Sequence, residues 1–142
     1  MAVFILPPSH ATYITEEYHF EFGEMHKGND SLFRVTKQSK KIPLITEGKY
    51  VFGFVLKRLN SKPFNCQLKI KLPGKTQKQE GISKNINVDK NNMLVLPSKV
   101  CEGEWRSVMW FNEGDPAGIW RLYLYIDGTQ YKEFDFEVYE KE

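Results

Sequence analysis

Hydrophobic and polar residues alternate with a period of two over several stretches of this chain. Between residues 18 and 22 three aromatic side chains alternate with His19 and Glu21, and residues 64–72 alternate without a break. Because successive side chains of a β-strand point to opposite faces, this pattern predicts strands that bury one face. No stretch shows the 3.6-residue period of a helix of normal length, so we expect an all-β chain.

The segment 49–59 differs because it carries hydrophobic residues on both faces. A strand with two apolar faces is typical of the centre of a sheet. Gly53 lies in its middle, and a glycine inside a strand marks a bend or a close approach of another backbone. We therefore expect a central strand that packs tightly near Gly53.

Turn-forming residues separate the strand-like stretches, as at Lys27–Ser31 and Pro73-Gly74. Short strands between regularly spaced turns predict a sandwich or a barrel, and we predict a sandwich. We expect eight or nine strands: 18–22, 33–35, 49–59 with 42–46 leading into it, 64–72, 82–88, 93–96, 104–112 and the two strands of a closing hairpin at 118–138.

The length of 142 residues fits one domain. We expect a single β-sandwich domain over residues 1–142, with residues 1–12 as a loosely ordered N-terminal arm. Aromatic residues make up 14% of the chain and alanine occurs only three times, and both features favour strands over helices.

The closing segment has the pattern of two strands joined at Asp127-Gly128. An Asp-Gly pair is typical of a two-residue type I′ turn. Directly opposed residues share a face, so this turn would place Leu122 opposite Glu133 in a regular hairpin. Hydrophobic residues of one strand would then face the carboxylates of the other.

A one-residue change of loop length removes this conflict. We predict a three-residue loop, 126–128, closed by Gly128 in a left-handed bulge conformation. This register matches apolar, charged and aromatic partners, because it pairs Trp120 with Phe134, Arg121 with Glu133 and Tyr123 with Tyr131. The predicted core face consists of Trp120, Leu122, Leu124, Phe134, Phe136 and Val138.

The opposite face of this hairpin is the main candidate site. It combines tyrosines with charged residues, and tyrosine is enriched where proteins bind one another. The alternative is that the rings only shield a solvated sheet. The candidate protein contacts are Arg121, Tyr123, Tyr125, Tyr131, Glu133 and Asp135 on this face, with Glu113 and Asp115 in the loop 113–118.

Two segments near the C-terminus carry a family resemblance. Gly118-Ile119-Trp120, the Asp-Gly turn and the sequence FDFEV at 134–138 resemble the closing hairpin of bacterial immunoglobulin-like sandwiches. The preceding stretch WRSVMWFNEGDPAG is similar to the penultimate strand of a small bacterial family of unknown function. The resemblance covers about 40 residues and implies an antiparallel immunoglobulin-like sandwich without a catalytic residue. The chain departs from the immunoglobulin pattern because Cys66 and Cys101 do not flank a tryptophan in the expected way.

The two cysteines, Cys66 and Cys101, are too few for a disulfide framework. Cys66 occupies an apolar position of an alternating strand, where a cysteine is usually a small core side chain. We therefore expect two free thiols.

The apolar run Val3–Leu6 is shorter than a signal-peptide core, so we expect a cytoplasmic protein, with export as the alternative if a native signal is missing.

Motifs for catalysis and cofactor binding do not stand out. The triplet GKT at 74–76 lacks the glycine-rich loop and the helix of a phosphate-binding site. His19, Glu21, Glu24 and His26 have a spacing that can chelate a metal, but solvated edge residues are the commoner explanation for it. We expect no cofactor, no metal and no enzymatic activity.

Nucleic-acid binding is also not favoured. The formal net charge is only +2, although lysines crowd the middle of the chain. A single-strand binder needs aromatic platforms between its cations. Lys69 and Lys71 share a predicted face with Asn65 and Gln67 rather than with rings.

We therefore expect a non-catalytic protein-binding module, for which a bacterial immunity or inhibitor protein is one concrete version. The alternatives are a carbohydrate- or envelope-associated sandwich and a single-stranded nucleic-acid binder. An enzyme with an unrecognised site is a further, less favoured alternative. A homodimer through an edge strand is a separate expectation, with the closing hairpin as the candidate edge.

Overall fold

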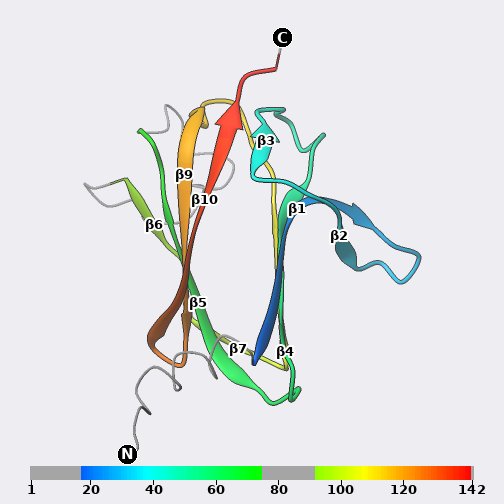
Figure 1. The fold of residues 1–142 in the computed structure, drawn as a ribbon. Coiled ribbons are helices and arrows are strands. Elements are labelled where there is room, and N and C mark those ends of the chain that lie inside the picture. The colour runs from blue at the N-terminus through cyan, green and yellow to red at the C-terminus, as the bar shows by residue number, and fades with distance from the viewer. Residues whose placement is uncertain (1–16, 75–91, 142) are drawn as a thin grey trace, which may run out of the picture.

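The computed structural model describes residues 17–74 and 92–141, and its described part is built from strands and loops without a helix (Figure 1). Ten strands follow one another in these described residues: β1 (Tyr18–Lys27), β2 (Phe33–Gln38), β3 (Lys41–Pro43), β4 (Phe52–Arg58), β5 (Phe64–Lys71), β6 (Met93–Val95), β7 (Lys99–Cys101), β8 (Glu104–Met109), β9 (Gly118–Ile126) and β10 (Thr129–Tyr139). The expected N-terminal arm 1–12 and the expected strand 82–88 lie outside the described residues.

The strands form two layers that stand side by side in Figure 1. Sheet A has the order β2-β1-β4-β8, and sheet B has the order β3-β10-β9-β5-β6, with β7 also paired to β5. The all-β sandwich is confirmed. All strand pairs are antiparallel except β3 with β10, which run parallel, so sheet B is mixed.

Inward-facing side chains of both sheets fill the space between the layers. Aromatic rings dominate this core, with Phe52 stacked on Phe111 at 4.7 Å and Phe22 4.9 Å from Phe136. The predicted core face of the closing hairpin is confirmed, because its residues are buried, with Phe134 partly buried against them. The period of two therefore located the buried face correctly.

The predicted register of the hairpin is wrong. Asp127 and Gly128 form a two-residue turn, both with positive φ (50° and 82°), as a type I′ turn requires. A bulge between Gln130 and Lys132 inserts one extra residue into β10. Beyond the bulge the apolar residues of β10 lie opposite the apolar residues of β9. Phe134 then pairs with Leu122 rather than with Trp120.

The bulge also moves Tyr131. Its ring packs against Tyr18 of sheet A, with ring centroids 5.0 Å apart, so it lies on the core side of sheet B. The prediction that Tyr131 pairs with Tyr123 on the outer face is therefore wrong, and Glu133 takes that place opposite Tyr123. Loss of water around the Tyr131 phenol, together with the neighbouring Tyr18, raises its pKa.

The hairpin is a sheet edge along only part of β10. β9 lies between β10 and β5, and β10 pairs with β9 along its length and with β3 at residues 137–139. The hairpin therefore contributes an edge of sheet B only through residues 129–136 of β10, which pair with no second described strand, while β5 covers β9 and β3 covers the end of β10.

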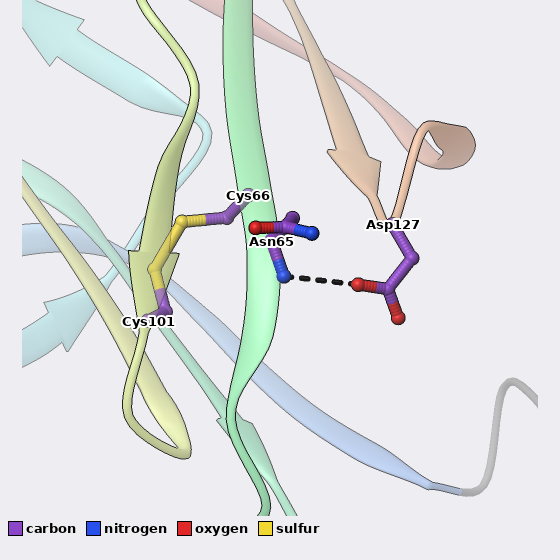
Figure 2. Close-up of a disulfide and its surroundings, with 4 residues drawn as sticks. All are labelled: Asn65, Cys66, Cys101 and Asp127. Carbon is purple, nitrogen blue, oxygen red and sulfur yellow. Dashed lines mark hydrogen bonds between the residues drawn. A yellow bond between two sulfur atoms is a disulfide. The ribbon is translucent and has the colours of Figure 1, made fainter.

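Cys66 and Cys101 form a disulfide, which contradicts the expected free thiols (Figure 2). β7 pairs antiparallel with β5, and this pairing places the two cysteines one diagonal step apart, with Cα atoms 6.4 Å from each other. Both side chains are buried. The bond connects positions 35 residues apart in the sequence.

The turn of the closing hairpin is hydrogen-bonded to β5, the strand that carries Cys66. Asn65 donates its backbone N–H to Asp127 Oδ1 at 2.9 Å, as the dashed line in Figure 2 shows, and Asp127 donates its own N–H to the Asn65 carbonyl at 2.9 Å. The disulfide and this pair of hydrogen bonds hold β7, β5 and the hairpin turn together at one end of sheet B.

Candidate functional site

The outer surface of sheet B carries most of the residues that the sequence singled out. Pairing of β10, β9 and β5 sets their outward side chains in rows across the sheet. One row joins Asp135, Arg121 and Lys71, and the next joins Glu133, Tyr123 and Lys69. We call the following residues the outer-face cluster: Glu133 and Asp135 on β10, Arg121, Tyr123 and Tyr125 on β9, and Lys69 and Lys71 on β5.

Arg121 organises the acidic side of this cluster. Its Nε lies 2.5 Å from Asp135 Oδ1 and its second nitrogen donates to Asp135 Oδ2 at 3.1 Å, which is a bidentate ion pair. Glu133 approaches the same guanidinium at 3.4 Å. Hydrogen bonding from Arg121 lowers the pKa of Asp135, so this carboxylate stays ionised near neutral pH.

The basic side of the cluster contains a cation over an aromatic ring. The Lys69 ammonium lies 4.7 Å from the centre of the Tyr125 ring. Tyr125 also lies near Gln130, with its hydroxyl 3.5 Å from the amide oxygen. Sequence reasoning placed the lysines and the tyrosines on separate surfaces, and this was wrong because β5 and β9 are neighbours in the sheet although they are distant in the chain.

The loop residues Glu113 and Asp115 have different environments. Asp115 is buried, and its carboxylate accepts the backbone N–H of Asn112 at 3.0 Å. This hydrogen bond closes the loop, so Asp115 has a structural environment rather than that of an exposed contact. Glu113 is exposed on the same loop.

A second feature is a groove of about 660 Å³, which we call the corner groove. It lies where the chain passes from β2, at the edge of sheet A, to β3, at the edge of sheet B. Burial and the neighbouring Glu24, which accepts a hydrogen bond from the Tyr50 hydroxyl at 3.3 Å, raise the pKa of Tyr50 to about 12. The groove is lined by Glu24, Lys37, Ser39, Lys41, Pro43, Tyr50, Glu137, Tyr139 and Lys141.

The His/Glu set near the N-terminal strand does not converge. Glu24 lies 3.3 Å from His26, whose other ring nitrogen is 2.6 Å from the Thr36 hydroxyl. His19 and Glu21 pair with the opposite end of β4. In residues 17–74 and 92–141 no group of three or more His, Cys, Asp or Glu side chains could hold a metal ion.

No helix among the described residues is long and apolar enough to cross a membrane.

The family model of the PM0630 beta sandwich domain matches residues 20–139. The chain belongs to this family. Among solved structures it is similar to an immunoglobulin-like protein (PA1606) from Pseudomonas aeruginosa, with a TM-score of 0.58 and 17% identity over 85% of this chain and 92% of that chain. At this identity the similarity shows the fold alone, and it confirms the expected immunoglobulin-like sandwich for this member of the PM0630 family.

Two other solved structures match this chain with lower scores. A putative lipoprotein from Bacillus anthracis is 12% identical over 84% of this chain and 85% of that chain, with a TM-score of 0.37. A β-glucosidase from Listeria innocua is 9% identical with a TM-score of 0.38, and this PM0630 domain covers 86% of its own length but only 16% of that enzyme. Scores this low carry no argument about function. A search of curated proteins found no match.

Proposed function

We propose that this PM0630 domain is a protein-binding module whose contact surface is the outer-face cluster of sheet B. The observation that carries the proposal is the ordered arrangement of this surface: two tyrosines lie between an acidic and a basic column of side chains. Such a face offers flat ring area and opposite charges at fixed positions to a folded partner.

The rigidity of the cluster supports a role in recognition. Arg121 is held by two carboxylates, and Lys69 is held over a ring, so these side chains lose little conformational freedom when a partner binds. β9, which lies beneath Arg121 and the two tyrosines, pairs with β10 on one side and with β5 on the other, which gives the centre of the surface a rigid base.

The test compares partner capture by the wild type and by a Tyr123→Ser/Tyr125→Ser variant, from lysate of the source organism. Both rings lie on the outer face, so the variant is expected to fold and to lose the partner. Tyr139→Ser is the matched control, since it removes a tyrosine of the corner groove, and it should retain the partner. Equal capture by all three proteins would contradict the assignment of the surface. If the captured partner is a toxin, and the stoichiometric complex persists at high salt, the result would support the more specific hypothesis of an immunity protein.

The disulfide bears on where this function takes place. Disulfides persist in oxidising compartments and are rare in the reducing cytoplasm. The buried Cys66–Cys101 bond therefore supports the exported alternative over the cytoplasmic one. Quenching cells of the source organism with acid and then labelling the denatured protein with maleimide-polyethylene glycol tests this, because a cytoplasmic protein would be labelled at both cysteines.

The corner groove supports a second candidate function, binding of a short saccharide. Tyr50 and Tyr139 provide rings beside a set of ammonium, carboxylate and hydroxyl groups, which is the combination that sugar rings and their hydroxyls require. Isothermal titration with a neutral glucose oligomer and with a uronic-acid oligomer tests it. Binding that is lost in Tyr139→Ala and kept in Tyr125→Ala would place the saccharide in this groove, and no heat with either oligomer would count against this candidate.

A further inference from the structure

The outer-face cluster separates its charges by strand. Glu133 and Asp135 form an acidic column on β10, and Lys69 and Lys71 form a basic column on β5. β9 runs between the columns and presents Arg121, Tyr123 and Tyr125. The two columns occupy the same two rows of the sheet, since Asp135 and Lys71 both flank Arg121, and Glu133 and Lys69 both flank Tyr123.

This arrangement is complementary to itself under one rotation. Consider a two-fold axis that lies in the contact plane and runs along β9. It exchanges the β10 side of the sheet with the β5 side but keeps each row at the same position along the strands. The β10 column of one copy then faces the β5 column of the other, so Glu133 meets Lys69 and Asp135 meets Lys71. The contact is isologous, and each charge pair occurs twice.

The charge pattern also excludes the other in-plane rotation. An axis across the strands would place β10 on β10 and β5 on β5, so acids would face acids and lysines would face lysines. Like charges that face one another at an interface oppose association. Only the axis along β9 satisfies both columns.

The centre of the face is compatible with this contact. Tyr123 and Tyr125 of one copy would meet the same rings of the other, and aromatic residues are enriched at the centres of interfaces. Arg121 would approach its symmetry mate, but each guanidinium already has its own Asp135 and Glu133 within 3.4 Å. The strand directions of two facing sheets differ by about 30°. The columns of the two copies therefore still oppose one another, while the side chains at the ends of the rows lie farther from their partners.

The size of the face is sufficient. The strands of sheet B are three to eleven residues long, and at about 4.8 Å between strands and about 3.4 Å per residue they give on the order of 600 Å² of face per copy. Stable specific interfaces bury about 600–1,000 Å² per partner, so this face matches the lower end of the standard range.

We propose that the partner of the outer-face cluster is a second copy of this chain, bound face to face about a two-fold axis parallel to β9. This inference rests on the proposed protein-binding function and names the partner. The dimer joins two sheet faces rather than two sheet edges, so it differs from the edge-strand dimer expected from the sequence.

The test is a charge swap in one row, measured by sedimentation equilibrium at low ionic strength. Glu133→Lys sets lysine against Lys69 twice in its own dimer, and Lys69→Glu sets glutamate against Glu133 twice. We expect each variant alone to dimerise at least about tenfold more weakly than the wild type. An equimolar mixture should recover affinity, because in the mixed dimer one pair is native and the other is reversed but complementary. Both substitutions keep Arg121 and Asp135, although Glu133→Lys also removes the second carboxylate beside Arg121.

Two outcomes would overturn the inference. A wild type that stays monomeric at millimolar concentration rules the dimer out, and a dimer that neither variant weakens uses a different surface. Recovery in the mixture is the result that a general loss of folding cannot produce. A monomeric wild type that still captures another protein through Tyr123 and Tyr125 would remove this inference and leave the proposed function intact.

Discussion

Gly23 and Gly53 lie directly opposite each other where β1 pairs with β4 in the centre of sheet A. Neither position has room for a side chain. A Cβ atom on Gly53 would lie 1.9 Å from the backbone oxygen of Ser107, and one on Gly23 would lie 2.0 Å from that of Lys37. Gly53 thus lets β4 approach β8 closely and Gly23 lets β1 approach β2, which confirms the expected close approach at Gly53.

Gly53→Ala should therefore destabilise the fold strongly. The obstructing atom is backbone of β8, which can move only if the sheet distorts, so we expect a loss of about 3 kcal/mol or more in the free energy of unfolding. Gly48→Ala is the matched control, because Gly48 has a positive φ of 72° but open space around it, and it should cost about 1 kcal/mol. Urea denaturation measures both, and equal losses would contradict the proposed steric origin.

Removal of the disulfide should lower stability by about 4 kcal/mol, since the bond closes a loop between positions 35 residues apart. Cys66→Ala/Cys101→Ala tests this by urea denaturation, and wild type treated with dithiothreitol should show a similar loss. Unfolded wild type that was purified without reductant should give no reaction with a thiol reagent. Two reactive thiols in that sample would contradict the bond.

The sequence pattern was sufficient for the sandwich and for the buried face of each long strand, because burial imposes the period of two on any strand that covers a core. It was not sufficient for strand pairing. A bulge such as the one at Tyr131 can absorb one residue at any point along a strand, so the register of β10 could not be derived from side-chain matching alone.

Contacts between distant segments account for the other errors. β7 has three residues and no alternation to reveal it, and its pairing with β5 is what brings Cys101 to Cys66. The position of Lys69 over Tyr125 depends on β5 and β9 being neighbours, which no local pattern shows. The tyrosines and acids of the candidate site were visible in the sequence, whereas the basic column that completes the site was assigned to another surface.

The turn residue Asp127 should contribute measurably to stability. Asp127→Ala removes the acceptor of the Asn65 N–H and a residue that tolerates positive φ, so we expect a loss of about 1–2 kcal/mol. Asp127→Asn keeps a side-chain oxygen and the turn preference, and it should lose much less. If both variants lose the same amount in urea denaturation, the negative charge rather than the hydrogen bond is the source of the effect.

Tyr50 provides a test of the corner groove at alkaline pH. Burial and the charge of Glu24 raise its pKa to about 12, whereas an unfolded tyrosine titrates near 10. A raised pKa means that the neutral phenol is favoured in the fold, so this contribution to stability is complete below about pH 10 and is lost as the pH rises toward 12.

Absorbance of tyrosinate near 295 nm should follow this ionisation in the folded protein. Tyr50→Phe should remove one of the last steps of the titration, above about pH 11. Glu24→Gln keeps a hydrogen-bond acceptor but removes the neighbouring charge, so it should lower the pKa of Tyr50 without abolishing the step. In guanidinium chloride the wild type and Glu24→Gln should titrate alike, because all seven tyrosines are then exposed to solvent. If the folded Tyr50→Phe variant and the wild type show the same absorbance change above about pH 11, Tyr50 is not held in the partly buried position that the corner groove requires.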